Sequence, residues 1–259
     1  MPEGDTVWRT AHHLHEVLAG RDLVTFDLRV PDFATSDLTG HRVDEVVSRG
    51  KHLLTRIGSF TLHTHLKMEG AWHVQPRGAG WRRPAHSARA VLETTEHQAI
   101  GYSLGVVELV PRDAEDTVVG HLGPDLLGPD WDAAEAVRRL RTDPTRPVFL
   151  ALLDQRNLAG LGNEYVNELL FTAGLAPTRP VSDVPDLPRL VARGRQMLDV
   201  NKARVERSFT GSTRPGQERW VYSRERRPCR RCGTRISQGS LGDDPVRQRN
   251  TFWCPHCQT

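Results

Sequence analysis

The feature that most limits how this chain folds is its four cysteines, which form two identical pairs near the C-terminus. They are Cys229-x-x-Cys232 and, after twenty-one intervening residues, Cys254-x-x-Cys257. In a reducing compartment such pairs are typical of a tetrahedral four-thiolate site, whereas disulfides belong to oxidising compartments. The spacing therefore predicts one structural Zn²⁺ held by Cys229, Cys232, Cys254 and Cys257, with no position left open for a catalytic water.

The length of 259 residues is enough for about two domains, each with its own core. No apolar run approaches the roughly 18–20 residues that a membrane span needs. The N-terminus lacks the basic start and the apolar stretch of a signal peptide. We therefore expect a cytoplasmic protein with no membrane partner.

Positive charge is concentrated at the C-terminal end of the chain. Residues 200–259 contain 13 Lys and Arg against 5 Asp and Glu, a net charge of +8, and the remainder carries −5. A basic segment around a metal site is typical of a face that binds nucleic acid. A solvated arginine-rich surface is the alternative, because charge runs alone are weak evidence.

The first 125 residues show a helical pattern followed by a β pattern. Apolar residues at helical spacing predict a first helix: Val7, Ala11, Leu14 and Leu18. Asp5 or Thr6 is the expected N-cap of this helix. Short apolar runs then predict a β-sandwich or barrel: Arg42–Val47, His52–Ile57, Phe60–Leu66 and Ala88–Glu93.

Helical spacing returns after two Gly-Pro-Asp turns. It predicts four helices: Asp132–Arg141, Pro147–Leu153, Asn163–Ala173 and Leu187–Arg207. The second and third are joined by a loop with glycines at 160 and 162. Backbone amides at the start of the Asn163 helix can receive an anion such as a DNA phosphate.

The N-terminus offers a possible nucleophile. If Met1 is removed, Pro2 presents a secondary amine, and an α-amino group titrates at about 7.7–8 against about 10.4 for lysine. At neutral pH the terminus is therefore the better prepared amine. Glu3 places a carboxyl group beside it, suited to proton transfer.

Together, these features resemble the formamidopyrimidine-DNA glycosylase/endonuclease VIII family, and the resemblance is closest to bacterial endonuclease VIII. It covers essentially the whole chain. The matching segments are Met1-Pro2-Glu3-Gly4, Arg49-Gly50-Lys51-His52-Leu53-Leu54, Leu122-Gly123-Pro124-Asp125, the Asp154–Asn163 junction and the closing segment Arg249–Gln258.

The resemblance implies an α+β multidomain fold in three parts. Residues 1–125 would form an N-terminal β-sandwich with a leading helix, and this part would be the catalytic domain. Residues 126–215 would form a DNA-binding domain of the helix-two-turn-helix type. Residues 216–259 would form the four-cysteine zinc finger.

The resemblance also assigns roles to individual residues. Pro2 would form a Schiff base with the sugar, Glu3 would move protons, and Lys51 would contact phosphate and assist catalysis. Asn163 and Arg249 would complete a phosphate clamp, which fixes position without reading sequence.

Base flipping leaves a void in the duplex that a side chain must fill. By resemblance Met68 would fill it. The family's second insertion loop reads Gly101-Tyr102-Ser103-Leu104-Gly105 here, without its arginine and phenylalanine, so Leu104 or Tyr102 would have to substitute. Thr6 stands where the family often has a glutamate, which leaves Asp5 as the nearest acid besides Glu3.

The implied function is that of a bifunctional DNA glycosylase and abasic-site lyase of base-excision repair. Oxidised bases, pyrimidines above all, would be removed and the strand cut by β,δ-elimination. The partner would be damaged DNA, bound by a monomer near the nucleoid, with no organic cofactor. The alternatives are a zinc-finger DNA-binding module without catalysis, a lyase that acts on abasic sites only, and a metal-dependent nuclease.

Histidines offer a second possible metal site. His63 and His65 alternate on a predicted strand and so share a face. Without a third ligand in register, we expect them to be ordinary hydrogen-bonded residues.

Overall fold

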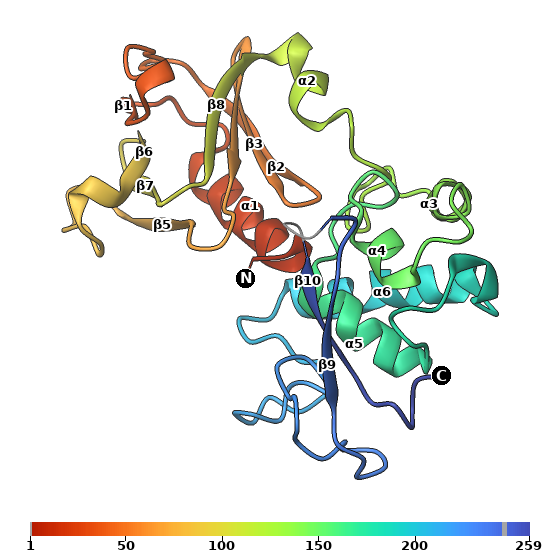
Figure 1. Ribbon diagram of the computed structural model, residues 1–259. Helices are drawn as coiled ribbons and strands as arrows, with labels where there is room; N and C mark the ends of the chain where they lie inside the picture. Colours follow the sequence, from red (N-terminus) through yellow and green to blue (C-terminus); the bar gives the residue numbers. More distant parts are fainter. Residues whose placement is uncertain (1, 245–247) are drawn as a thin grey trace. The chain divides into compact units, whose positions relative to one another are not determined.

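The chain divides into two units, one ending at His121 and one beginning at Leu122 (Figure 1). The computed structural model describes residues 2–244 and 248–259, so Met1 lies outside the described residues. The division falls four residues before the sandwich boundary expected at residue 125. The helical segment and the finger both lie in the second unit.

The first unit contains α1 (Gly4–Leu18) and eight strands. The strands are β1 (Thr25–Leu28), β2 (Val43–Arg49), β3 (His52–Ile57), β4 (Phe60–His65), β5 (Ala71–Pro76), β6 (Ala88–Glu93), β7 (His97–Tyr102) and β8 (Val106–Pro111). Short helical segments complete it: η1 (Pro31–Phe33), η2 (Ala85–Ser87), η3 (Arg112–Ala114) and α2 (Asp116–Val119).

The strands form two antiparallel sheets of four strands each, which confirms the predicted β-sandwich. Their orders are β1-β6-β7-β5 and β2-β3-β4-β8. One core cluster joins α1 to both sheets, with Leu14 from the helix, Leu92 from the first sheet and Leu62 from the second. The predicted stripe on the first helix is therefore its buried face.

Helix α1 starts earlier than its N-cap prediction. Glu3 is the N-cap, with an extended backbone (φ −125°, ψ −174°), and Gly4 is the first helical residue. The prediction of Asp5 or Thr6 as the N-cap is wrong. Asp5 instead lies in the first turn, where an acidic side chain interacts favourably with the exposed amides of a helix start.

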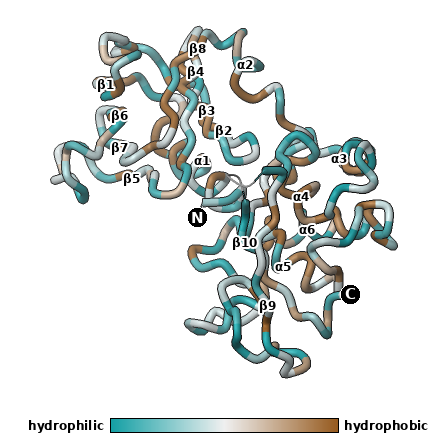
Figure 2. The backbone as a smooth tube through the Cα atoms, in the orientation of Figure 1, coloured by the Kyte–Doolittle hydropathy of each residue, from teal (hydrophilic) through white to brown (hydrophobic). Residues whose placement is uncertain are grey.

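The second unit has a helical core and a small sheet. Its elements are α3 (Ala133–Leu140), α4 (Val148–Leu153), α5 (Asn163–Ala173), η4 (Val181–Asp183), α6 (Leu187–Lys202), β9 (Ser237–Leu241) and β10 (Arg249–Trp253). Figure 2 shows hydrophobic residues along α4, as the buried Phe149 and Leu152 require. Among the described residues, no helix combines the length and the apolar content needed to cross a membrane.

Helix α6 ends at Lys202, five residues before the predicted end at Arg207. The amide group of Asn201 explains the stop. Its Nδ2 donates to the carbonyl of Ser208 at 3.2 Å, and its Oδ1 accepts from the amide of Ser208 at 2.9 Å. The side chain thus folds the following loop back onto the helix end.

A buried polar face of α5 attaches the finger to the helices. The Glu168 carboxylate accepts three backbone N–H groups, from Trp220 at 2.8 Å, Val221 at 2.9 Å and Tyr222 at 2.8 Å. Burial raises the pKa of Glu168 to about 7, against the effect of these donors, which lower it. Three amides of the finger therefore depend on one side chain of the helix.

Replacing Glu168 by alanine should destabilise the second unit. Three N–H groups would lose their acceptor, one of them in a fully buried contact and two in partly buried ones, and each unsatisfied buried group costs about 1–3 kcal/mol. We expect a loss of at least about 3 kcal/mol in the free energy of unfolding, measured by urea denaturation of the full chain. Glu206→Ala, at an exposed position, is the control; equal denaturation midpoints for the two variants would contradict this assignment.

Candidate functional site

The chain start places an amine candidate and two carboxyl groups together. Pro2 is half-buried, and Glu3 is fully buried directly before α1. Asp5 is also buried, and its carboxylate accepts from the hydroxyl of Thr6 at 3.3 Å. An amine at this point would have a carboxyl group for a neighbour on the same rigid helix start, which suits proton transfer.

Lys51 lies in the two-residue turn between β2 and β3. Gly50 precedes it with φ 58°, a left-handed value that glycine adopts without strain at the first position of a hairpin turn. Arg49 and His52 are the last paired residues before the turn. Helix α1 packs on both β2 and β3, so the Lys51 hairpin and the helix that follows Pro2 form one packed layer.

Met68 and Leu104 have opposite environments. Met68 is 65% exposed in the turn after β4, whereas Leu104 is 7% exposed and belongs to the sandwich core. Tyr102 is fully buried. An exposed Met68 side chain is able to enter a duplex. Neither Leu104 nor Tyr102 presents a side chain to solvent, so this conformation does not support the DNA contact predicted for Leu104 or Tyr102.

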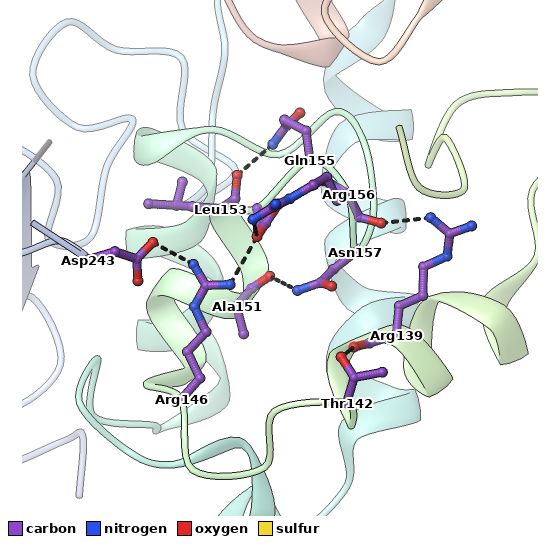
Figure 3. Close-up of polar contacts among 10 residues, drawn as sticks. Arg139, Thr142, Arg146, Ala151, Leu153, Gln155, Arg156, Asn157 and Asp243 are labelled. Atoms are coloured by element: carbon purple, nitrogen blue, oxygen red, sulfur yellow. Dashed lines mark hydrogen bonds and ion pairs between the residues drawn. The ribbon is translucent and has the colours of Figure 1, made fainter. Parts of the chain in front are cut away.

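The loop between α4 and α5 is fixed by its own side chains (Figure 3). Gln155 donates to the carbonyls of Leu153 at 2.8 Å and Leu161 at 2.9 Å, and it accepts from the amide of Gly160. Asn157 donates back to the carbonyl of Ala151 at 2.9 Å. These bonds set the position at which α5 begins.

Ion pairs brace the same loop from outside. Asp154 pairs with Arg156 at 2.7 Å and with Arg146 at 2.9 Å, and Arg146 also reaches Asp243 at 2.8 Å (Figure 3). The hydrogen bond from Arg156 is the main reason that the pKa of Asp154 lies well below its usual range. Asp154 is therefore a carboxylate at neutral pH, and it links the loop to the finger.

One side chain links the segments that carry Asn163 and Arg249, which are far apart in sequence. Asn163 is buried at the start of α5, and Arg249 is exposed at the start of β10. The Nδ2 of Asn167 lies 3.4 Å from Asn163 Oδ1 and 3.4 Å from the carbonyl of Asn250, the residue after Arg249. The start of α5 and the start of β10 are therefore linked by one side chain.

The four cysteines cluster as predicted. Their Sγ atoms all lie within 4.8 Å of one another, and those of Cys232 and Cys254 are 3.5 Å apart. Four thiols at this spacing have the donor set and the separation of a structural metal site. The site lies against a small core that includes Phe171 of α5 and Phe252 of β10.

A hydrogen-bonded group of His52, His63 and Glu108, next to Lys51 in the chain, was not predicted from the sequence. His52 Nδ1 lies 2.8 Å from His63 Nε2, and His63 Nδ1 lies 2.9 Å from Glu108 Oε2. The rings of His65 and His121 meet His52 edge-on. The shared face of His63 and His65 was the available signal, but Glu108 joins them only through the pairing of β4 with β8.

Two family models match the chain. One, described as the formamidopyrimidine-DNA glycosylase N-terminal domain, matches residues 1–103. The other, described as the formamidopyrimidine-DNA glycosylase H2TH domain, matches residues 122–208. Together they cover most of the chain.

Whole-length relatives agree with these matches. The chain is 51% identical over 260 residues to the DNA-(apurinic or apyrimidinic site) lyase Nei2 of Mycolicibacterium smegmatis, covering 100% of this chain and 99% of the relative. It is 50% identical over 262 residues to Endonuclease 8 2 of Mycobacterium tuberculosis, covering 100% of both. A solved structure of MutM in complex with DNA containing carbocyclic 8-oxo-G is 25% identical, with a TM-score of 0.81 over 100% of both chains.

The stability of the folded chain should fall in mild acid because of the histidine group. Burial is the main cause that lowers the pKa of His52 to about 3 and of His65 to about 4, from an ordinary value of 6.5. Below about pH 6.5 the unfolded chain therefore binds protons that the folded chain does not. Between pH 6.5 and 4 we expect the free energy of unfolding to fall, by at most about 1.4 kcal/mol per pH unit for each imidazole.

Urea denaturation at pH 7 and pH 5 measures this slope. His52→Asn should reduce the loss of stability between the two pH values. His86→Asn, which changes an exposed histidine, should not. A His52→Asn protein with the full wild-type slope would show that His52 is not held neutral.

Proposed function

The chain belongs to the formamidopyrimidine-DNA glycosylase/endonuclease VIII family, and we propose that it excises oxidised pyrimidines through a Schiff base formed by Pro2. Its activity is that of a bifunctional DNA glycosylase and abasic-site lyase of base-excision repair. The observation that carries the proposal is the chain start, where Pro2 directly precedes a buried Glu3 at the head of α1.

The reaction begins once Met1 has been removed. The nitrogen of Pro2 attacks C1′ of the damaged nucleotide and the glycosidic bond breaks. The base leaves with the bonding electrons and with the proton that the Pro2 nitrogen gives up. Opening of the sugar ring yields an iminium between Pro2 and C1′. Glu3 is placed to donate the proton that the ring oxygen needs.

Strand cleavage follows from the iminium. Its positive charge acidifies the C2′ proton, and loss of that proton expels the 3′ phosphate by β-elimination. A second elimination at the 5′ side releases the sugar fragment from the other phosphate. No step needs a metal or an organic cofactor, which is consistent with a structural role for the cysteine site.

Three residues are assigned to the DNA backbone. Lys51 contributes a cation from its hairpin turn, while Asn163 and Arg249 grip a phosphate from the second unit. Because these contacts reach phosphates, they fix the position of the DNA without selecting a sequence. Met68, exposed on its turn, fills the void that the flipped nucleotide leaves.

The metal of the cysteine cluster is assigned as one Zn²⁺. Four cysteines close a tetrahedral shell, the arrangement of structural zinc sites. The ion would tie the loop that carries Cys229 and Cys232 to the end of β10, and so hold Arg249 in place. Thiolates that persist as metal ligands fit a reducing cytoplasm, where we infer that the protein works on chromosomal DNA as a monomer.

Strand cleavage of two DNAs tests the proposed activity. One oligonucleotide carries an abasic site and the other an oxidised pyrimidine. Pro2→Gly should slow cleavage of both on the order of a hundredfold or more, because the secondary amine is lost. Pro185→Gly, in an exposed loop, is the control, and mass spectrometry verifies that Met1 is absent.

The products separate the candidate functions. The 51% identical relative is named as a lyase alone, so cleavage of the abasic DNA only is the specific alternative. Release of the oxidised base supports the bifunctional enzyme. Wild-type protein that binds both DNAs and cuts neither would refute the proposed function in favour of a binding module.

Zinc analysis tests the metal assignment. We expect about one zinc per chain, a large loss of zinc in Cys254→Ser, and at least about a tenfold weaker affinity for DNA in that variant. His256→Asn changes an exposed residue between two of the ligands and should keep its zinc. Full zinc content in Cys254→Ser would contradict the four-cysteine site.

A further inference from the structure

Three strands place a row of polar residues on one face of the second sheet. Pairing of β3 with β4 sets His52 opposite His65, and pairing of β4 with β8 sets His63 opposite Glu108. Their sequence neighbours belong to the sandwich core: Leu53, Leu62 and Val107. Since side chains alternate along a strand, the polar row lies on the face of the sheet away from that core.

The hydrogen bonds in this row have one consistent direction. The Glu108 carboxylate can only accept, so His63 Nδ1 carries a proton and donates to it at 2.9 Å. When this is the only proton on the His63 ring, Nε2 can accept from His52 Nδ1, which lies 2.8 Å away. In that arrangement a neutral His52 carries its proton on Nδ1 and a free electron pair on Nε2.

The surroundings keep His52 neutral. Burial is the main cause that lowers its pKa to about 3, and the histidines and lysine around it lower it further: His65, His63, His121 and Lys67. Arg49 adds a cation opposite His52 on β2. Among the described residues, the acidic group hydrogen-bonded to this row is Glu108, and its contact is with His63.

The row ends at the residue that closes the Lys51 turn. His52 follows Lys51 directly, and its side chain is held by β4, which is held in turn by β8. His63 is 4% exposed and its ring stacks on His52 with centroids 5.0 Å apart, so this linkage has little freedom to rearrange. Backbone pairing of β2 with β3 fixes the position at which the turn begins and ends. The row of side chains fixes the orientation of His52, which closes the turn.

We propose that Glu108 and His63 are positioning residues for Lys51, acting through a neutral, tautomer-fixed His52. The role assigned to Lys51 rests on the proposed function. The hydrogen bond to Glu108 fixes which nitrogen of His63 is protonated, and the hydrogen bond to His63 then fixes which nitrogen of His52 is protonated. His52 in turn holds the lysine turn against the sheet. Because His52 is neutral, the residue that follows Lys51 adds no charge of its own, and phosphate meets the lysine without a competing imidazolium.

Two substitutions at Glu108 test the hydrogen-bond chain. The side chain is 45% exposed, so neither variant threatens the fold. Glu108→Gln keeps an oxygen that accepts from His63, whereas Glu108→Leu removes the acceptor, and both remove the same charge. We expect single-turnover cleavage of abasic DNA to slow about tenfold in Glu108→Leu and less than about twofold in Glu108→Gln.

Equal rates in both variants would overturn the proposal, whether at wild-type level or equally reduced. Wild-type rates would mean that the chain does not position Lys51. An equal reduction would assign the effect to charge and not to the hydrogen bond. His63→Phe, which keeps a stacking ring but no nitrogen, should match Glu108→Leu in rate and retain the wild-type circular dichroism spectrum.

The tautomer itself can be read without DNA. The ¹⁵N and ¹H NMR signals of the imidazoles at pH 7 should show His52 protonated at Nδ1 alone, and this preference should disappear in Glu108→Leu. A wild-type His52 protonated at Nε2 would overturn the proposal. Wild-type protein that cleaves neither DNA would instead refute the proposed function, which this measurement does not depend on.

Discussion

The packing of the second unit depends on α5, a helix whose buried Asn and Glu side chains all have hydrogen-bond or ion-pair partners. In α5, Asn163, Glu164, Asn167 and Glu168 are all at most 8% exposed, although such residues normally favour solvent. Each of them has a partner outside the helix or one turn away. Glu168 accepts hydrogen bonds from three backbone N–H groups of the finger, and Asn167 accepts from the amide of Phe252 at 2.6 Å. Glu164 pairs with Arg207 and Arg219. The finger is thus held by hydrogen bonds with fixed geometry, and removing either side leaves buried groups unsatisfied.

In the first unit, the two segments that we propose to be reactive lie on a rigid support. The chain start is anchored because Glu3 and Gly4 are buried where α1 begins, and α1 packs into the core shared by both sheets. Lys51 is presented by a hairpin turn that packs beside the same helix. Pro2 directly precedes this buried helix start, which restricts the freedom of its backbone.

The sequence predicted several features that depend on local pattern. The cysteine cluster, the limits of β3 and the bounds of α5 follow from neighbouring residues, and each prediction was confirmed. The N-cap of α1 and the end of α6 are also local, but both were predicted wrongly. What the sequence could not predict were partners set by long-range pairing. Glu108 meets His63 across 45 residues, and Glu168 meets the finger across more than 50. Leu104 shows the same limit, because whether a leucine in a turn reaches solvent or core depends on packing that no spacing encodes.

The proposed mechanism depends on the nitrogen of Pro2 as the group that joins the DNA. The most direct measurement is reduction with borohydride during reaction on abasic DNA, followed by digestion and mass mapping of the trapped peptide. We expect one covalent adduct on the N-terminal peptide, carried by Pro2, from chains that lack Met1. An adduct on Lys51, or none from processed protein that binds the DNA, would contradict it.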